Sequence, residues 1–433
     1  MSGDGPAGLP AATLVATQVA ERAARESYGR LVAILSARTR DIALAEDALA
    51  EAFASALASW PREGVPANPP AWLLTVARRR TLDQWRHAQV EEDAAQQMLA
   101  TADELGWDAE SSAVPDERLR LLFVCAHPAV QPAARAPLML QTVLGLDVSR
   151  MAAAFLTAPT TLGQRLVRAK ARIREAGISF EYPQARDLPQ RLQDVMDGIY
   201  AAYGTGWDDV EGADNARQGL TTEAIELCRI LCGLMPQEPE PHGLLALMLF
   251  CEARVRARRN HADAYVPLDQ QDTALWAQPL IHEAEALLLA AARRGTPGAY
   301  QLEAAIQSAH TQRRLGAAVP PRALVVLYDA LMALRPDVGV QVSRACALAE
   351  AQGVSAGLQA LDALPANAVA DYQPYWAARA HLLAQTHDIA QAQKAYDRAM
   401  GLTENVAVRA WLAAARESAD KLQDGAGPTP VQP

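Results

Sequence analysis

Apolar residues recur at helical spacing along most of the chain, and the places where this pattern stops divide the chain into segments. Residues 13–88 read as helices interrupted once, at the loop Pro61 to Pro70, because proline cannot continue a helix. Residues 89–114 lack apolar periodicity and carry an excess of acids, which is typical of an extended linker. Short helices return over residues 115–183. The pattern predicts two small helical domains joined by an acidic linker.

Beyond residue 187 the helices become longer, are richer in alanine and leucine, and are joined by short turns. The best candidate for a repeat unit is Tyr375 to Leu402, whose alanines would let two paired helices approach closely. This segment resembles a tetratricopeptide repeat, and hairpins of that kind stack into a solenoid. We expect an all-α protein with a tetratricopeptide-like solenoid over residues 187–416 and a disordered tail over residues 417–433.

The composition agrees with a helical protein of several domains. The chain has 433 residues, of which 50% are hydrophobic, 21% charged and 5% aromatic, and it is too long for one ordinary core. No segment approaches the ~20 apolar residues that cross a bilayer, and Met1 to Pro10 lacks the regions of a secretory signal. We therefore expect a cytoplasmic protein without a membrane partner. The five cysteines are an odd number without a CxxC pair, which favours buried thiols over a disulfide framework or a zinc site.

The net charge of −10 argues against indiscriminate binding of nucleic acid, but the basic residues are not spread evenly. One cluster lies at Arg78, Arg79, Arg80 and Arg86, and another extends from Arg165 to Arg174 without an acid. Phosphate contacts require clustered lysine and arginine. Because both clusters lie in the first 175 residues, we expect an anion-binding surface in the N-terminal part of the chain.

Residues 147–174 have the form of a helix-turn-helix, with a short helix, a tight turn and a longer helix. On the longer helix one apolar stripe is expected to face inward, and it consists of Leu162, Leu166, Ala169 and Ile173. The opposite side could enter a DNA major groove. Its candidate DNA contacts are Thr160, Thr161, Gln164, Arg165, Arg168, Lys170 and Arg172.

The position of each residue along this helix predicts its role. Thr160 or Thr161 can cap the helix start beside a phosphate. Residues near the N-terminal end would meet base edges, and the later basic residues would meet phosphates. The competing interpretation is an amphipathic helix whose basic face is only solvated. The preceding helix and turn, and the lack of acids between Thr160 and Arg174, favour DNA binding.

Residues 43–86 combine an acidic amphipathic helix, the proline-rich loop and a helix rich in arginine. Glu46, Asp47 and Glu51 could pair with a basic partner surface, although acids at such positions also form solvated faces. After the loop, Trp72 and the arginines that follow it offer an aromatic surface and cations to a nucleic acid. Trp72 taken alone would fit a core position better.

These residues also carry a resemblance to a known family. The combination AEDALAEAF, WP and NPPAWLLTVARRR, between residues 45 and 80, closely resembles region two of the extracytoplasmic-function sigma factors of bacterial RNA polymerase. PDERLRLLFVCAHPA and AAAFLTAPTTLGQRLVRAKARIREAGI, within residues 115–178, resemble region four of the subgroup with a C-terminal tetratricopeptide-like extension. The resemblance continues through HGLLALMLFCEAR, PLDQQDTALW, GAYQLEAAIQSAH and LYDAL. These motifs are modest singly and specific in this order.

The resemblance implies a partner for each segment. The acidic helix would dock on the clamp of the largest subunit of core RNA polymerase through Glu46, Asp47, Glu51 and Phe53. Region four would read the upstream promoter element and contact the polymerase flap, and the acidic linker would run through the active-site and RNA-exit channels. The loop at residues 61–70 would capture a base flipped from the melting strand. The downstream promoter contacts would be Asn68, Trp72, Arg78, Arg79 and Arg80.

No nucleophile elbow, phosphate loop, paired-histidine metal motif or dinucleotide fingerprint occurs in the sequence, so we expect no enzymatic activity, no metal and no cofactor. Two other functions stay open: a helix-turn-helix regulator that works without polymerase, and a repeat scaffold whose sigma-like part has lost DNA binding. The acidic first-domain helix argues against the first, and Arg165 and Arg168 argue against the second. The sequence predicts a sigma factor that directs core polymerase to specific promoters. Its repeat domain would modulate this activity, with a regulatory protein or peptide as candidate partner.

Overall fold

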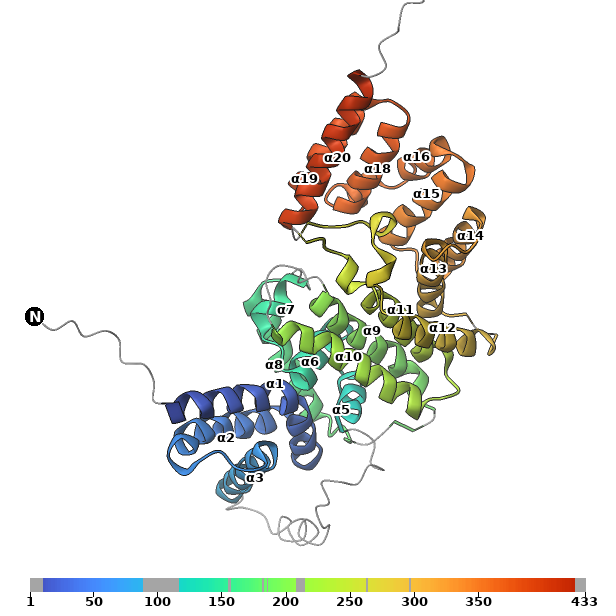
Figure 1. Ribbon diagram of the computed structural model, residues 1–433. Helices are drawn as coiled ribbons and strands as arrows, with labels where there is room; N and C mark the ends of the chain where they lie inside the picture. Colours follow the sequence, from blue (N-terminus) through green and yellow to red (C-terminus); the bar gives the residue numbers. More distant parts are fainter. Residues whose placement is uncertain are drawn as a thin grey trace, which may run out of the picture. The chain divides into compact units, whose positions relative to one another are not determined.

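A computed structural model describes the chain over residues 11–88, 117–154, 157–180, 183–184, 186–207, 215–261, 264–295 and 297–424 (Figure 1). Over these residues the regular structure is helical, apart from an isolated β-bridge between Arg259 and Tyr265. The predicted all-α fold is thereby confirmed. Contacts divide the chain into two compact units, Met1–Leu234 and Met235–Pro433. None of the helices in the described ranges is long and apolar enough to cross a membrane.

The first unit begins with three helices packed on one another, and they are α1 (Ala11–Thr39), α2 (Ile42–Glu63) and α3 (Pro69–Ala88). Asp41 is the N-cap of α2, where its side chain accepts from the backbone N–H groups of Ala43 and Leu44 at 2.9 and 3.2 Å. At the start of α3 the side chain of Asn68 accepts from the N–H of Ala71 at 3.1 Å. These polar groups cap the starts of the two helices that flank the proline-rich loop.

Four shorter helices follow, namely α5 (Glu117–Cys125), α6 (Pro132–Leu144), α7 (Val148–Ala154) and α8 (Pro159–Glu175). The short helix, turn and longer helix predicted for this segment are α7, the turn after it, and α8. Helix α6 ends at Gly145, whose φ of 68° lies in the left-handed region that favours glycine. Both α7 and α6 pack against α8, so its apolar stripe is covered from two sides.

The last helices of the first unit are α9 (Leu188–Trp207) and α10 (Asn215–Leu234), which pack on each other while α9 packs on α6. The approach is close at Gly198, where an added Cβ atom would clash with the sulfur of Met139. The C-terminal domain was expected to begin at residue 187. The contacts instead place α9 and α10 with the first unit, because the apolar face of α9 is covered by α6.

The second unit is a succession of helices: α11 (Pro239–Glu252), α12 (Gln278–Ala292), α13 (Ala299–Arg314), α14 (Pro321–Leu334), α15 (Val338–Gln352), α16 (Val354–Asp362), α17 (Ala366–Val369), α18 (Gln373–Gln385), α19 (Ile389–Gly401) and α20 (Val406–Asp424). Short 3-10 turns lie between α11 and α12, at Val255–Ala257, Leu268–Gln270 and Thr273–Leu275. Neighbouring helices in the chain pack together, as α14 does with α15 and α18 with α19. Such sequential hairpins are the arrangement of a helical solenoid.

The predicted repeat unit forms the hairpin of α18 and α19. Its alanines Ala380, Ala392 and Ala399 are fully buried in one core cluster, which confirms that small residues let these helices approach closely. Helix α20 extends to Asp424, so the beginning of the expected tail at residues 417–433 is helical, because α20 packs on α19. The remainder of that tail, and the expected linker at residues 89–114, lie outside the described residues.

Candidate nucleic-acid interface

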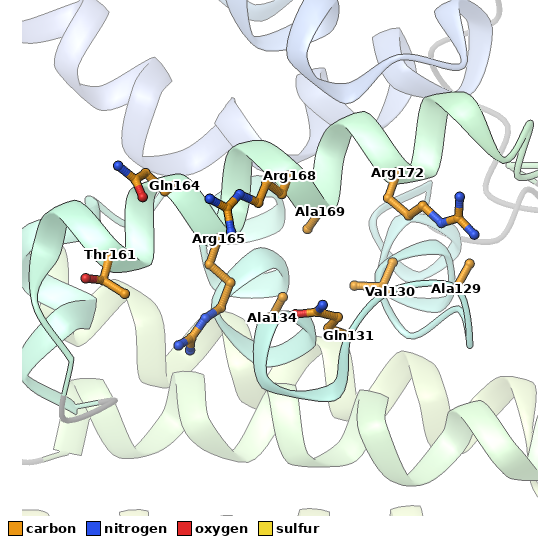
Figure 2. Close-up of a pocket in the computed structure, with 10 residues that line it drawn as sticks. All are labelled: Ala129, Val130, Gln131, Ala134, Thr161, Gln164, Arg165, Arg168, Ala169 and Arg172. Carbon is orange, nitrogen blue, oxygen red and sulfur yellow. The ribbon is translucent and has the colours of Figure 1, made fainter.

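The exposed side of α8 lines a hollow of about 470 Å³ beside the start of α6 (Figure 2). The predicted apolar stripe of α8 is buried, which confirms which face of the helix points inward. The floor of the hollow comes from Val130, Gln131 and Ala134, among others. The polar wall consists of Thr161, Gln164, Arg165, Arg168 and Arg172. The fold thus brings five of the seven predicted upstream contacts to one surface.

Three arginines give this surface its charge. Arg165, Arg168 and Arg172 are three and four residues apart and therefore share one side of the helix. Figure 2 shows Arg165 extending from α8 toward the start of α6, and Arg172 extending on the side of Ala129. The Nη1 of Arg165 donates to the carbonyl oxygen of Ala133 at 3.4 Å. One guanidinium group can bind two phosphate oxygens through two parallel hydrogen bonds. Among the described lining residues none is acidic. The surface can hold a polyanion.

The start of α8 differs from the prediction. The N-cap is Ala158, which makes no side-chain cap, and Pro159 is the first helical residue. Proline favours this position because its fixed φ suits a helix and the helix needs no N–H there. Thr160 and Thr161 consequently lie inside the first turn, so the expectation that one of them caps the helix was wrong. Both remain exposed.

Lys170, another predicted DNA contact, does not line the hollow. Its Nζ lies 2.5 Å from the Oε2 of Glu46 on α2, and the two side chains are only 11% and 16% exposed. Burial raises the pKa of the Glu46 carboxyl, and the charge of Lys170 opposes that rise. The structure therefore joins a residue predicted to bind DNA to one predicted to bind polymerase.

A second ion pair lies beside the first. The Nη1 of Arg174 is 3.2 Å from the Oδ2 of Asp41, the residue that caps α2. Neither residue was predicted as a site. The spacing of apolar and charged residues along one helix cannot reveal a partner 133 positions away in the sequence. The sequence therefore contains no signal that predicts this contact.

The other predicted polymerase contacts on α2 are accessible to different degrees. Asp47 and Glu51 are exposed, and Phe53 is half-buried. The Oε2 of Glu51 lies 3.4 Å from the Nε of Arg80 on α3, with both side chains about half exposed. Exposed pairs of this kind contribute little to stability, so Glu51 and Arg80 are available to outside partners.

Trp72, one of the predicted downstream contacts on α3, forms an aromatic pair with Trp60 of α2. The ring of Trp72 meets the edge of Trp60 with centroids 5.4 Å apart and planes at 66°. Trp60 is only 3% exposed and was missed as part of this site, because it lies on α2, across the loop. Asn68 is exposed, Arg78 is half-buried, and Arg79 and Arg80 are exposed. Trp72 is half-buried, so Trp60 fixes its ring while part of it stays accessible.

The cysteines are free thiols. Cys125, Cys228 and Cys232 are buried, as expected, while Cys251 and Cys346 are partly buried. Burial raises the pKa of the Cys125 thiol to about 12, although Thr142 beside it opposes the rise. Such thiols are protonated at neutral pH and act as small apolar groups.

Comparison with known proteins identifies two parts of the chain. Residues 24–90 match the family described as sigma-70 region 2, and residues 191–292 match a family of unknown function, DUF6596. An uncharacterised protein of Rhizobium meliloti (strain 1021) is 38% identical over 379 residues, which cover 86% of this chain and 89% of that protein. The chain belongs to the same family as that protein.

One solved structure is also similar, that of yeast Tom70, with 11% identity and a TM-score of 0.29 over 95% of this chain and 85% of that one. A likeness at that level says nothing about function. The match to sigma-70 region 2 contains the predicted polymerase contacts on α2 and the downstream DNA contacts on α3. It supports a role as a sigma factor in transcription initiation. The hollow beside α8 lies outside both matched segments.

Proposed function

We propose that this protein is a sigma factor of the extracytoplasmic-function type, which directs core RNA polymerase to specific promoters. The observation that carries the proposal is the combination of a sigma-70 region 2 domain at residues 24–90 with a second, basic helical surface on α8. One surface suits polymerase and melted DNA, and the other suits duplex DNA. A polymerase-independent regulator would not need the first.

Region two contributes the polymerase contact. The exposed carboxylates of Asp47 and Glu51 present negative charge to a basic surface on the clamp of the largest subunit, and Phe53 adds apolar contact. Glu46 joins them once it leaves Lys170. The downstream promoter element then meets α3 and the loop before it, through Asn68, Trp72, Arg78, Arg79 and Arg80.

Region four, comprising α5 to α8, reads the upstream element and contacts the polymerase flap. Thr160, Thr161, Gln164 and Arg165 lie near the start of α8, where side chains of a recognition helix meet base edges. Arg168 and Arg172 follow toward its end and suit phosphates, as does Lys170 after release from Glu46. A guanidinium can bind the N7 and O6 of a guanine with two hydrogen bonds, which favours Arg165 as a base-reading residue.

The C-terminal helices modulate this activity as a tetratricopeptide-like domain. Hairpins that pack mainly on their neighbours leave extended side surfaces free for a protein or peptide. In our proposal a regulatory protein or peptide binds there and changes how the sigma regions engage polymerase. The protein acts by binding alone, without an enzymatic step.

Run-off transcription with purified core polymerase tests the proposal. Genomic fragments of the source organism serve as templates, and transcript starts are mapped by sequencing. We expect starts at a small set of shared sequences when the protein is added, and none at these sites with core alone. Variant Asp47→Lys/Glu51→Lys is the matched control and should lose both core binding and these transcripts. Sequence-specific DNA binding without any binding to core would instead indicate a polymerase-independent regulator.

A further inference from the structure

Region two and region four contact each other directly within the first unit. Helix α1 packs on α5 and α6, and α2 packs on α8. We call these contacts together the closed contact. They involve two kinds of interaction, a close approach of helices at two glycines and a pair of salt bridges.

The close approach lies where α1 meets the end of α6. A Cβ atom on Gly29 would clash with the carbonyl oxygen of Val143, so only glycine fits without moving one of the helices. A Cβ on Gly145 would lie 2.9 Å from the ring of Tyr28. Region two therefore contributes one glycine and region four the other. Any larger residue at Gly29 must push the regions apart.

The salt bridges lie where α2 meets α8. Lys170 and Glu46 are 2.5 Å apart and mostly buried, and Arg174 lies 3.2 Å from Asp41, which is only 16% exposed. Burying either charge of the first pair is costly unless its partner lies beside it, whereas Arg174 of the second pair is 57% exposed. The two pairs therefore favour one relative position of α2 and α8.

We infer that the closed contact is an autoinhibited resting state, in which region four of the chain is the intramolecular competitor of core polymerase for α2. This rests on the proposed function, in which Glu46 binds polymerase and Lys170 binds DNA. Each of these residues holds the other, so neither reaches its outside partner until the two regions separate. Asp47 and Glu51 stay exposed, so polymerase can contact them first while the two regions are still together.

This arrangement has a measurable cost for binding. When only a fraction of molecules is open, the apparent dissociation constant for core equals the intrinsic constant divided by that fraction. Breaking the closed contact must therefore tighten core binding. Polymerase, once bound, must in turn hold region four away from α2, because linkage is reciprocal.

The first test measures the distance between the regions in the free, full-length protein. Spin labels at Glu63→Cys and Glu175→Cys, both exposed positions, report the distance by pulsed electron paramagnetic resonance. The partly buried Cys251 and Cys346 are replaced by serine in this background. We expect one dominant distance, a longer and broader distribution on adding Lys170→Glu, and return of the original distance in the charge-swapped Glu46→Lys/Lys170→Glu protein. An unchanged distance in Lys170→Glu would overturn the inference.

The second test opens the contact without touching a proposed binding residue. Gly29→Ala should lengthen the same distance and lower the apparent dissociation constant for core about tenfold, or ~1.4 kcal/mol. Gly233→Ala on α10 is the matched control, because nothing lies within 4 Å of its added Cβ. Circular dichroism checks folding. If Gly29→Ala does not fold, the core affinities of Lys170→Glu and Glu46→Lys/Lys170→Glu decide instead. A longer distance with unchanged core affinity would overturn autoinhibition.

The outcomes also separate this inference from the proposed function. If no form of the protein binds core, the proposed function fails. The inference then fails with it, even if the charge-swap series confirms the closed contact. If core binds equally well to the wild type, Gly29→Ala and Gly233→Ala, the proposed function stands and the autoinhibited state is wrong.

Discussion

The two units of this molecule use their charged residues differently. In the second unit, ion pairs join different helices of the stack, as Arg335 at the end of α14 does with Glu303 of α13 at 2.7 Å, and Arg313 of α13 with Glu350 of α15 at 2.8 Å. In the first unit, the basic residues of α8 gather on one open surface around the hollow. Paired charges link the helices of the second unit. The clustered arginines of α8 repel one another instead, and an anionic partner would relieve that repulsion. In our proposal the first unit is the part that binds nucleic acid, and this difference supports that assignment.

The first unit also contains ion pairs that join its helices, such as Arg118 of α5 with Glu223 of α10, and the closed contact supplies another. There Lys170 and Glu46 form a pair of the structural kind within the first unit, although both belong to proposed binding surfaces. The lesson is that a charge can serve stability in one state and recognition in another. The following changes test how far this contrast between the units extends, from the largest expected effect to the smallest.

Truncation after Pro183 should have the largest effect, because it removes α9 and α10 from the first unit. These helices cover Met139 and Leu140, and α10 also supplies Glu223, which pairs with Arg118 of α5. Each large apolar side chain left uncovered costs roughly 1.5–3 kcal/mol. We expect a sharp fall in the melting temperature measured by circular dichroism, whereas truncation after Leu234 should retain the melting of the first unit. Equal melting of the two truncated proteins would contradict this.

The basic surface of α8 should give the next largest effect. Arg165→Ala should reduce discrimination between promoter and random DNA by ~1–3 kcal/mol. Arg172→Ala should weaken binding to both DNAs alike and make its salt dependence less steep. Fluorescence anisotropy at several salt concentrations measures both, and Arg322→Ala, at an exposed position of the second unit, is the control that should change neither. Equal losses on both DNAs for Arg165→Ala would rule out base reading by that residue.

In the second unit, substitution of a paired arginine should affect stability and leave DNA binding unchanged. Arg335 pairs with Glu303 and lies 4.9 Å from the centre of the Tyr300 ring, so Arg335→Ala should cost about 1 kcal/mol of unfolding free energy. Arg398→Ala is the matched control, since its partner Asp371 is 86% exposed, and should cost less. Denaturant titration measures both. The contrast between the units fails if Arg335→Ala weakens promoter binding.

The smallest effect concerns the starts of two helices. Thr160→Ala should change the unfolding free energy by less than about 0.5 kcal/mol, because Thr160 does not cap α8. Asp337→Ala should cost about 1 kcal/mol, since the side chain of Asp337 accepts from the N–H of Val340 at 2.9 Å at the start of α15. Denaturation midpoints compare the two. A larger loss for Thr160→Ala than for Asp337→Ala would show that Thr160 is a cap after all.

By itself the sequence predicted that most of the chain is helical and which side of particular helices faces inward. The stripe on α8 and the buried alanines of α18 and α19 followed from spacing alone, because helical periodicity is a local property. The basic clusters were visible for the same reason. The resemblance to region two placed the candidate contacts on α2 and α3.

The tertiary structure alone decided what each inward or charged face meets. Periodicity shows that α9 has an apolar face but not that α6 covers it, and these contacts group α9 and α10 with the first unit. The same holds for Lys170 and Glu46, which lie on helices far apart in the chain. Ion pairs and helix packing across such separations depend on where folding places two surfaces. No spacing within a single helix encodes that position.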